Sequence, residues 1–343
     1  MTGEGAAGEL MPRRRDVTRQ DVAARAGVST AVVSYVINSG PRPVAPATRE
    51  KVLRAIEELG YRPNRSAQSL RLGRTQTLAL LVPDISNPFF AELAGQVQLA
   101  AREAGYALHF ADVGNDPRDA DDQIATFVHR QVDGILVIGL DTSTDFSPAL
   151  ERGVPVVAMD NFRNTPSIPT VALNDRAAAH DGVIHLLSHG HSRIAMIAGP
   201  EGTAASEARI AGWADALGRP LEELRGSLVH AEYSPAGGMS AIRELLDRPT
   251  GASAVFVASD IQAVGVIRVL HAARVSIPGD LAVLGFDGTT EGAYTWPSLT
   301  TVRQPAAVMA QEACAIVTGA RPSGHLVVEH EIIRRQSCGC VPV

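Results

Sequence analysis

Carboxylate, amide and guanidinium side chains recur where apolar runs end in the later two thirds of the chain. Such groups can form several hydrogen bonds with the hydroxyls of a small molecule, and aromatic rings can pack on its apolar faces. The polar candidates are Asp160, Asn161, Asn174, Asp175, Arg209, Asp260 and Asp287. The aromatic candidates are Phe89, Phe162 and Tyr233. Each aspartate also precedes a helix or turn, so helix capping is the alternative role.

Catalytic and metal-binding constellations are weaker. Asp160 and Asp287 could act as acid and base on a sugar, but the chain carries no P-loop or GxSxG motif, so we expect no enzyme. His185 and His189 lie four residues apart on an expected helix, a spacing that can hold a metal. No cysteine accompanies them at ligand spacing in the sequence. Cys338-Gly-Cys340 offers only two ligands near a chain end, so we expect no metal and no cofactor.

The elements that must position the ligand-binding groups alternate between apolar runs and helical patterns, which predicts parallel sheets with crossover helices. The first set of expected strands is TLALLVPDI, YALHFADV, GILVIGL and PVVAMDN. Helices are expected from Phe89 to Ala104 and over 117–130. The pattern restarts after residue 170, with strands RIAMIAG, SLVHAEY, AVFVASD and LAVLGFDG and helices over 176–189, 207–217, 235–247 and 261–273. Two doubly wound lobes, with a ligand cleft at the strand ends, are therefore predicted.

The N-terminal part has a different, all-α pattern. Thr18 and Asp21 form a capping box, Gly27 ends that helix, Ser29 can cap the next, and Pro46 suits the start of a third. The expected inward positions are Val22, Ala23, Ala26, Val32, Val33, Val36, Ile37, Val52, Ile56 and Leu59. Two short helices joined by a glycine turn and closed by a third form a helix-turn-helix, whose second helix belongs in the DNA major groove.

A short helical stretch from Arg65 to Leu72 follows the break at Arg62-Pro63-Asn64. It is too short to be stable alone, but it can order on DNA beside a copy of itself, with Leu70 as a wedge in the minor groove. The alternatives are a plain linker here and an ordinary three-helix bundle before it. The candidate DNA contacts are Thr18, Ser29, Thr30, Ala31, Ser34, Tyr35, Asn38, Asn64, Ala67 and Leu70.

Charge separates the two parts. Residues 12–74 carry 13 Arg and Lys against 5 Asp and Glu, whereas residues 75–343 carry 18 against 30. A basic head on an acidic body is typical of a nucleic-acid module attached to a control domain. The three cysteines, the lack of a long apolar run and the polar N-terminus predict a cytoplasmic protein with no membrane partner.

The chain resembles the lactose/galactose repressor (LacI/GalR) family over residues 17 to about 337. The resemblance rests on VTRQDVAARAGVSTAVVSYVIN, REKVLRAIEELGYRPNRSAQSLR, VPDISNPFFAEL, VDGILVIG, SHGHSRIAMIAGP, FVASDIQAVGVIRVL, SIPGDLAVLGFDG and PSLTTVRQP. It implies a helix-turn-helix domain with a hinge helix, followed by an α/β periplasmic-binding-protein-like core of two doubly wound lobes.

The expected domains are a disordered tail (1–15), the helix-turn-helix domain (16–62), the hinge (63–74), and two lobes. The N-terminal lobe comprises 75–172 and 302–327, and the C-terminal lobe comprises 173–301 and 328–343. The chain would cross between the lobes near residues 172, 301 and 327.

By the same resemblance, Phe89, Asn161, Arg209, Tyr233 and Asp287 fall where family members contact effectors. The full set of expected effector contacts is Phe89, Asp160, Asn161, Asn174, Arg209, Tyr233, Ser259 and Asp287. Two positions depart from the family pattern: Tyr35 replaces an arginine that many members use in the major groove, and Ser259 replaces a frequent asparagine.

The expected function is a ligand-responsive regulator, most simply a repressor of carbohydrate uptake or catabolism genes. It would bind a pseudo-palindromic double-stranded operator as a homodimer, since the C-terminus has no leucine heptads for a tetramer. The small-molecule effector would be a sugar or sugar derivative. The alternatives are a regulator that responds to a nucleobase, nucleoside or other metabolite as corepressor, and a solute-binding protein with no role on DNA.

Overall fold

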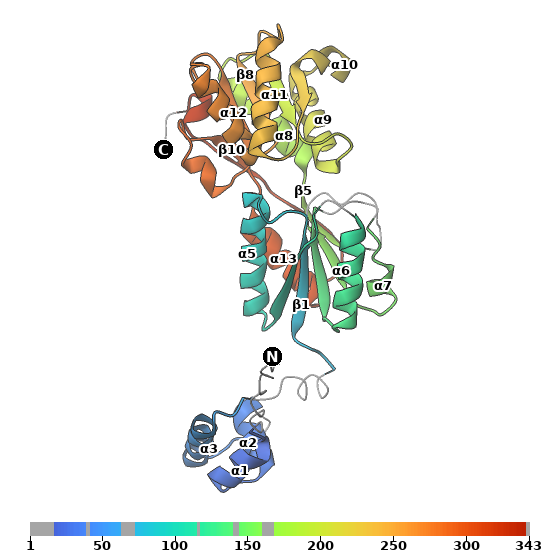
Figure 1. Cartoon of the computed structure of the whole chain (residues 1–343), viewed down its shortest axis with the longest axis vertical. Helices are drawn as coiled ribbons and strands as arrows, with labels where there is room; N and C mark the ends of the chain where they lie inside the picture. Colours follow the sequence, from blue (N-terminus) through green and yellow to red (C-terminus); the bar gives the residue numbers. More distant parts are fainter. Residues whose placement is uncertain are drawn as a thin grey trace, which may run out of the picture. The chain divides into compact units, whose positions relative to one another are not determined.

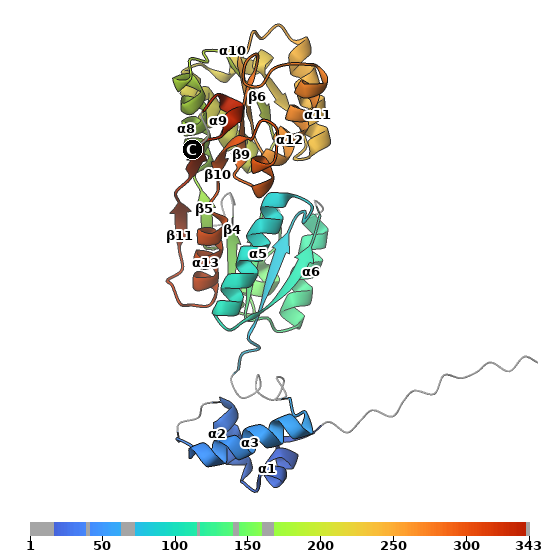
Figure 2. The same ribbon diagram turned by 90° about the vertical axis from the view of Figure 1, so that its left-hand side faces the viewer.

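A computed structural model describes residues 17–38, 42–62, 73–114, 117–139, 144–159 and 168–340. The chain divides into two compact units, Met1–Thr75 and Gln76–Val343. Figures 1 and 2 show a small helical unit and a larger unit built on two sheets. Within these ranges, no helix is both long enough and apolar enough to cross a membrane.

The helical unit contains α1 (Arg19–Ala26), α2 (Thr30–Asn38) and α3 (Pro46–Leu59). The predicted capping box is confirmed: the Thr18 amide donates to Asp21 Oδ2 at 2.7 Å, and the Asp21 amide donates to Thr18 Oγ1 at 3.4 Å. Gly27 ends α1 with a φ of 69°, and Gly60 ends α3 with a φ of 60°. Both glycines adopt the left-handed conformation that is strained for other residues.

A small apolar core joins the three helices. Val22, Val33 and Val52 have no exposed surface, and Tyr61 closes the core at 7% exposure. The other predicted inward positions, Ala23, Ala26, Val32, Val36, Ile37, Ile56 and Leu59, are buried in this core or pack against it. The structure adds Ala55, which is 3% exposed and was not expected because alanine carries little periodic signal.

The first sheet of the larger unit is parallel throughout, in the order β11-β5-β4-β3-β1-β2. Its strands are β1 (Thr77–Val82), β2 (Ala107–Asp112), β3 (Gly134–Ile138), β4 (Val156–Met159), β5 (Thr170–Leu173) and β11 (His325–Val328). The helices α5 (Pro88–Glu103) and α13 (Ala306–Val317) cover one face, and α6 (Pro117–His129) and α7 (Ser147–Leu150) cover the other (Figure 1). We call this sheet and its helices the first lobe.

The second lobe has the sheet order β12-β10-β9-β8-β6-β7, with only the edge strand β12 antiparallel. Its strands are β6 (Ile194–Ala198), β7 (Leu228–His230), β8 (Ala254–Val257), β9 (Ala282–Asp287), β10 (Thr300–Arg303) and β12 (Glu331–Ile333). Its helices are α8 (Asp175–Ser188), α9 (Ala204–Leu217), α10 (Leu221–Leu224), α11 (Pro235–Asp247) and α12 (Asp260–Ala272), with the short turns η1 (Arg225–Ser227), η2 (Thr290–Ala293) and η3 (Gln336–Cys338). The predicted α/β alternation is confirmed.

The hydrophobic pattern of the sequence places the start of one helix too late, because the pattern does not include the capping residue. The helix expected over 207–217 begins earlier, at Ala204, because Thr203 is extended and its carbonyl accepts the first helical hydrogen bond from Glu207 at 3.0 Å.

The chain passes between the two sheets after Leu173, after Arg303 and after Val328. The sequence placed these passages near residues 172, 301 and 327.

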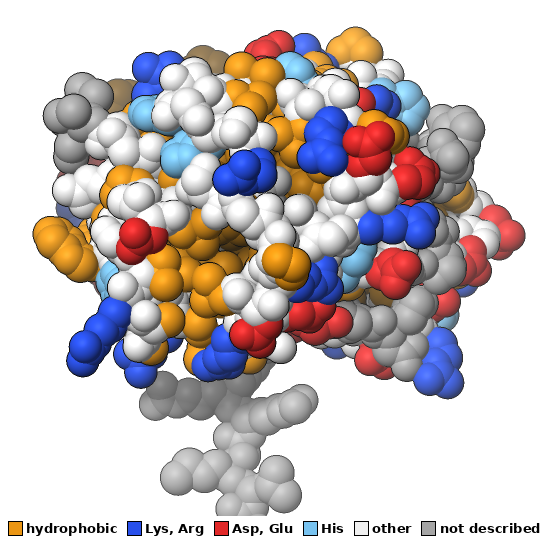
Figure 3. Space-filling model, turned by 90° about the horizontal axis from the view of Figure 1, so that it is seen from above, with side chains coloured by type: hydrophobic (Ala, Val, Ile, Leu, Met, Phe, Trp, Pro, Cys, Tyr) orange, Lys and Arg blue, Asp and Glu red, His pale blue; other side chains and the backbone are white. Residues whose placement is uncertain are grey.

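The surface of the second lobe seen in Figure 3 has no single sign of charge. Arg and Lys side chains are interspersed there with Asp and Glu, and hydrophobic side chains gather in the middle of the view. A face that binds nucleic acid would carry mostly positive charge. The mixed charges of this surface do not indicate a second nucleic-acid-binding face.

Candidate functional site: a buried carboxylate–arginine cluster and an exposed helix

Arg209, on α9, is the centre of a polar cluster at the carboxyl ends of the second lobe's strands. Its side chain is only 4% exposed, and Nε donates to Asp175 Oδ1 at 2.7 Å while Nη1 donates to the Ala258 carbonyl at 2.6 Å. Nη1 also lies 4.0 Å from Asp287 Oδ1. The guanidinium carbon stands 3.8 Å from the centre of the Phe286 ring. The cation is therefore held in one orientation by two carboxylates, a carbonyl and an aromatic face.

Asp287 ends β9 in an unusual backbone conformation. Its φ is 114°, and Gly288 follows with a φ of 78°. Such a strained residue persists only where its surroundings hold it in place, and it is a frequent feature of binding sites. Gln304 Nε2 donates to Asp287 Oδ1 at 2.9 Å. Burial raises the pKa of Asp287 well above its usual value, while Arg209 acts to lower it.

Asp260, the first residue of α12, is 1% exposed. Its carboxylate accepts from the Thr301 hydroxyl at 2.6 Å and from the Thr289 amide at 2.8 Å. Burial nevertheless raises the pKa of Asp260 to about 7, against the lowering effect of these hydrogen bonds.

The cluster has more carboxyl groups than cations. One guanidinium faces Asp175 and Asp287, and the nearby charge of Asp260 adds to burial in raising the pKa of Asp287. A carboxyl that keeps its proton can donate a hydrogen bond, whereas the ionised carboxyls accept. We name Asp175, Arg209, Asp260, Asp287 and Gln304 the carboxylate–arginine cluster.

Gln304 was missed by sequence reasoning. It follows β10, so it lies at the same edge of the sheet as Asp287, and the strand-end rule would have found it had it been applied to a fourth strand. Its side chain is 3% exposed, and Oε1 accepts no hydrogen bond from any described residue. A buried acceptor left open in this way is a ready partner for a ligand donor.

The expected effector contacts divide into four groups. Arg209 and Asp287 are brought together in the cluster. Ser259 and Asn174 are helix caps: Ser259 Oγ accepts from the Gln262 amide at 3.3 Å, and Asn174 Oδ1 accepts from the Ala177 amide at 3.1 Å. Asp160, Asn161 and the aromatic candidate Phe162 lie outside the described residues.

The two remaining aromatic candidates are packed side chains. The Tyr233 ring covers Gly199, at the end of β6, so closely that no side chain larger than hydrogen fits there. Tyr233 therefore lies at the carboxyl edge of the same sheet as Arg209. Phe89, at the start of α5, is 4% exposed and packs with its ring centre 5.7 Å from that of Phe90.

The second candidate surface is α2 of the helical unit. On α2, Thr30 and Ala31 are exposed, Ser34 and Tyr35 are half-buried, and Val33 is buried. Thr18 and Ser29 cap α1 and α2, with the Val32 amide donating to Ser29 Oγ at 3.3 Å. The Asn38 side chain and the residues Asn64, Ala67 and Leu70 lie outside the described part of the chain.

The histidine pair departs from what the sequence suggested. We expected no cysteine beside His185 and His189, but the structure places Cys338 and Cys340 against them, with the four ligand atoms within 4.8 Å of one another. The expectation was wrong because about 150 residues separate the two pairs, and folding of the C-terminal segment onto α8 removes that separation.

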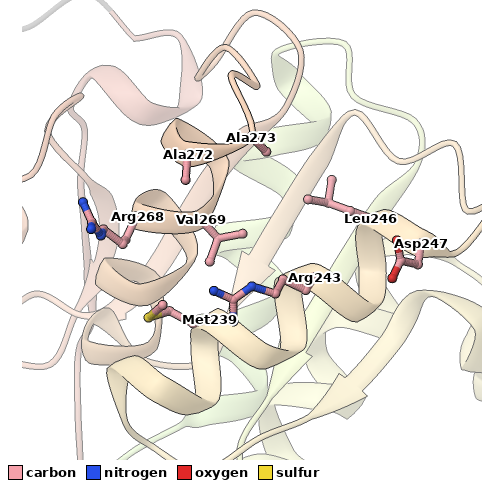
Figure 4. A pocket seen from close by; sticks show the side chains of 8 residues that line it. All are labelled: Met239, Arg243, Leu246, Asp247, Arg268, Val269, Ala272 and Ala273. Atoms are coloured by element: carbon pink, nitrogen blue, oxygen red, sulfur yellow. The ribbon is translucent and has the colours of Figure 1, made fainter.

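A groove on the outer surface of the second lobe is distinct from these sites. Figure 4 shows it between α11 and α12, with Leu246 and Val269 in its apolar lining. Its residues lie toward the carboxyl end of α12, whereas Asp260 begins that helix in the carboxylate–arginine cluster. The groove therefore does not belong to the strand-end site.

Comparisons with known proteins agree for both parts of the chain. Residues 18–64 match the family of bacterial regulatory proteins of the lacI family, and residues 183–338 match a periplasmic binding protein-like domain. The HTH-type transcriptional regulator CelR of Thermobifida fusca is 36% identical over 341 residues, covering 95% of this chain and 100% of CelR.

Two solved structures are similar along most of the chain. A complex of the transcriptional regulator CelR with cellobiose has a TM-score of 0.70 and 33% identity, covering 94% of this chain and 99% of the other. A lac repressor dimer bound to operator and an anti-inducer has a TM-score of 0.83 at 24% identity, with 94% and 99% coverage. The second likeness concerns the fold alone.

Proposed function

The chain belongs to the lacI family of bacterial regulatory proteins, and from this premise we propose that it is a transcriptional repressor whose affinity for operator DNA is set by a small hydroxylated effector. The observation that carries the proposal is the pairing of two sites in one chain. One is an exposed helix-turn-helix surface on α2, and the other is a buried binding cluster around Arg209.

The DNA-reading surface is short and polar. Thr30 and Ala31 offer methyl groups and one hydroxyl, and Tyr35 offers one hydroxyl. None of these can form the paired hydrogen bonds to guanine that arginine makes in the major groove. We therefore infer that methyl contacts and single hydrogen bonds carry the direct readout, and that more of the specificity depends on the centre of the operator.

The effector site favours a ligand rich in hydroxyl donors. Asp287, Asp175 and the open Oε1 of Gln304 are acceptors, while Arg209 donates from a fixed position. Sugars present several hydroxyls and one apolar ring face, which matches acceptors beside an aromatic residue. The CelR–cellobiose complex supports this class. A nucleobase or nucleoside is the competing ligand.

The three passages between the lobes provide a route from the effector to the DNA. A ligand that binds one arrangement of the lobes more tightly than another shifts their populations by its differential affinity, with a coupling of about 1–3 kcal/mol in typical systems. Residues 63–72 connect the core to the helix-turn-helix, so a change in the core reaches the DNA through them.

A homodimer follows from the need to read a pseudo-palindrome. The second lobe exposes two large aromatic side chains close together in sequence, Tyr294 at 84% and Trp296 at 76%. Exposed aromatic residues of this kind are enriched at interfaces, so we assign them to the contact between two copies. Replacing both with serine is expected to shift the protein toward monomer in sedimentation velocity while its circular dichroism stays unchanged.

The decisive experiment has two steps. Duplexes bound by the full chain are first selected from a random pool. Sugars and nucleosides are then screened by thermal shift, and each hit is tested for its effect on operator affinity by fluorescence anisotropy. A variant that lacks residues 1–74 should bind the effector and not the duplex. Operator binding by that truncated chain would contradict the proposal, as would a hit that leaves operator affinity unchanged.

A further inference from the structure

We propose that His185, His189, Cys338 and Cys340, the histidine–cysteine cluster, form a tetrahedral zinc site that joins the C-terminal segment to the end of α8. The proposal is independent of the effector, because it concerns four side chains that the carboxylate–arginine cluster does not use.

Three of the distances between ligand atoms are close to those of a tetrahedral set. His185 Nε2 lies 3.3 Å from Cys338 Sγ and 3.6 Å from Cys340 Sγ, and His189 Nε2 lies 3.4 Å from Cys340 Sγ. With zinc–sulfur bonds of about 2.3 Å and zinc–nitrogen bonds of about 2.0–2.1 Å, a tetrahedron separates nitrogen from sulfur by about 3.6 Å. All four ligand atoms lie within 4.8 Å of one another, so rotation of the side chains would bring the remaining distances toward this value.

The fold explains how the four groups converge. His185 lies in the last turn of α8 and His189 caps it, so a spacing of four residues places both rings on one side, with centroids 4.8 Å apart. Cys338 ends η3, and Gly339 follows with a φ of 92°. This left-handed residue turns the backbone between the two cysteines, so that both sulfurs reach the same histidine pair.

The charges of the site balance. Two thiolates and two neutral imidazoles around a divalent zinc have no net charge, which suits a site where Cys338 is 1% and His185 is 9% exposed. Zinc binding would release the two thiol protons to solvent, because only thiolates ligate it.

Further contacts would hold the ligands in place. The Thr300 hydroxyl lies 3.0 Å from Cys338 Sγ and could donate to that thiolate. Two sulfurs and two imidazoles favour zinc or another thiophilic ion over magnesium or calcium.

The site would tie two distant parts of the second lobe together. The helix α8 begins at Asp175, which accepts a hydrogen bond from Arg209, and its other end carries the histidines. The cysteines are contributed by the segment that follows β12, at the end of the described chain. A metal there would restrain both the C-terminal segment and the helix that positions Asp175.

The test uses the full-length protein, purified under reducing conditions. Its zinc content is measured by mass spectrometry of the metal, and the zinc-free protein is titrated with Co²⁺, which absorbs visible light strongly when bound tetrahedrally by thiolates. We expect one metal per chain. Cys340→Ser and His189→Gln, which alter the more exposed ligands, should each bind Co²⁺ about a hundredfold more weakly or worse.

Two control variants lie outside the site. Cys314→Ser removes the third cysteine, a buried residue of α13, and His191→Gln removes a neighbouring histidine that bonds to Ser253. Both should bind Co²⁺ as the unaltered chain does. Added zinc should raise the melting temperature of the unaltered chain and of the controls, but not that of Cys340→Ser.

Three outcomes would overturn the proposal. One is a zinc-free protein whose cysteines titrate as free thiols in the presence of excess Co²⁺ with no visible absorption. Another is a bond between Cys338 and Cys340, seen as a loss of two mass units that reductant reverses, with no metal bound after reduction. The third is equal Co²⁺ binding by Cys340→Ser, His189→Gln and the unaltered chain.

Discussion

The helical unit and the second lobe place their functional side chains in opposite ways. In the helical unit, Thr30 and Ala31 project from one short helix, and their neighbours in space are also their neighbours in sequence. In the second lobe, Asp175, Arg209, Asp260, Asp287 and Gln304 come from five separate places and are buried among one another. The residues that would read DNA are therefore positioned by one helix, whereas the residues of the effector cluster are positioned by the fold of the whole lobe.

The difference predicts where a substitution is felt. A change on α2 should alter binding and leave the fold intact, because the side chain has few partners to lose. A change in the carboxylate–arginine cluster should alter stability and binding together, because each group there satisfies another.

Arg209→Ala should cost the most. It leaves Asp175 and Asp287 buried without their cation, a situation that typically costs about 3–5 kcal/mol. Urea unfolding of the full chain should show the loss, and effector binding should disappear. Arg176→Ala is the matched control, since its ion pair with Asp215 is mostly exposed and contributes little. Equal stabilities for the two variants would contradict the claim that the buried cluster depends on Arg209 for its stability.

The pH dependence of the second lobe should be opposite to that of ordinary carboxylates. Burial raises the pKa of Asp260 to about 7, so the folded state binds a proton that the unfolded state releases near pH 4. Stability from this group is therefore fully present below pH 4, declines as the pH rises toward 7, and is absent above it. The decline should amount to a few kcal/mol.

The check is a series of denaturant melts between pH 4 and pH 8. Asp260→Asn removes the titrating group and should flatten the dependence, although it also alters the hydrogen bonds from Thr289 and Thr301. A slope that is identical in Asp260→Asn and in the unaltered chain would assign the effect to another group, of which Asp287 is the first candidate.

Tyr35→Arg should change DNA preference without changing the fold. An arginine at this position of α2 can pair with guanine, which is worth about 1–3 kcal/mol of discrimination for a well-placed contact. Duplex selection should then recover a different outer base pair. The stability of the unit should change by less than about 1 kcal/mol, because Tyr35 is only half-buried. An unchanged operator preference would remove Tyr35 from the reading surface.

Thr18→Ala should have a small and purely local effect. It removes the capping box of α1, and loss of such a cap typically costs about 1 kcal/mol. The cost should be seen in hydrogen exchange of the α1 amides, while effector binding by the core stays the same. A change in effector affinity would show that the two regions are less independent than their contacts indicate.

Much of the architecture could be predicted from local patterns. Three local signals predicted the helix-turn-helix: the capping box at Thr18, the turn at Gly27 and a proline, Pro46, at the first position of α3. Each of them acts within a few residues of the chain. The apolar runs marked the sheets, because strands buried on both faces are apolar throughout. Arg209 and Asp287 were found by the family resemblance together with the strand-end rule.

Three features were not obtained this way. Gln304 follows β10, a strand to which the strand-end rule was not applied. Ser259 and Asn174 have side chains suited to binding or to capping, and only their distances to Gln262 and Ala177 show that they cap helices. Cys338 and Cys340 meet His185 and His189 across about 150 residues, a distance that no spacing rule covers.

The sequence by itself determined the kind of protein, since helix caps, glycine turns and strand periodicity are local consequences of residue type. Only the tertiary structure decided how its charges are used. Arg209 faces several carboxyl groups in a buried place, and burial rather than residue type sets which of them keep their protons. The histidine–cysteine cluster has the same origin, because a site built from remote segments exists only after the hydrophobic core has brought them together.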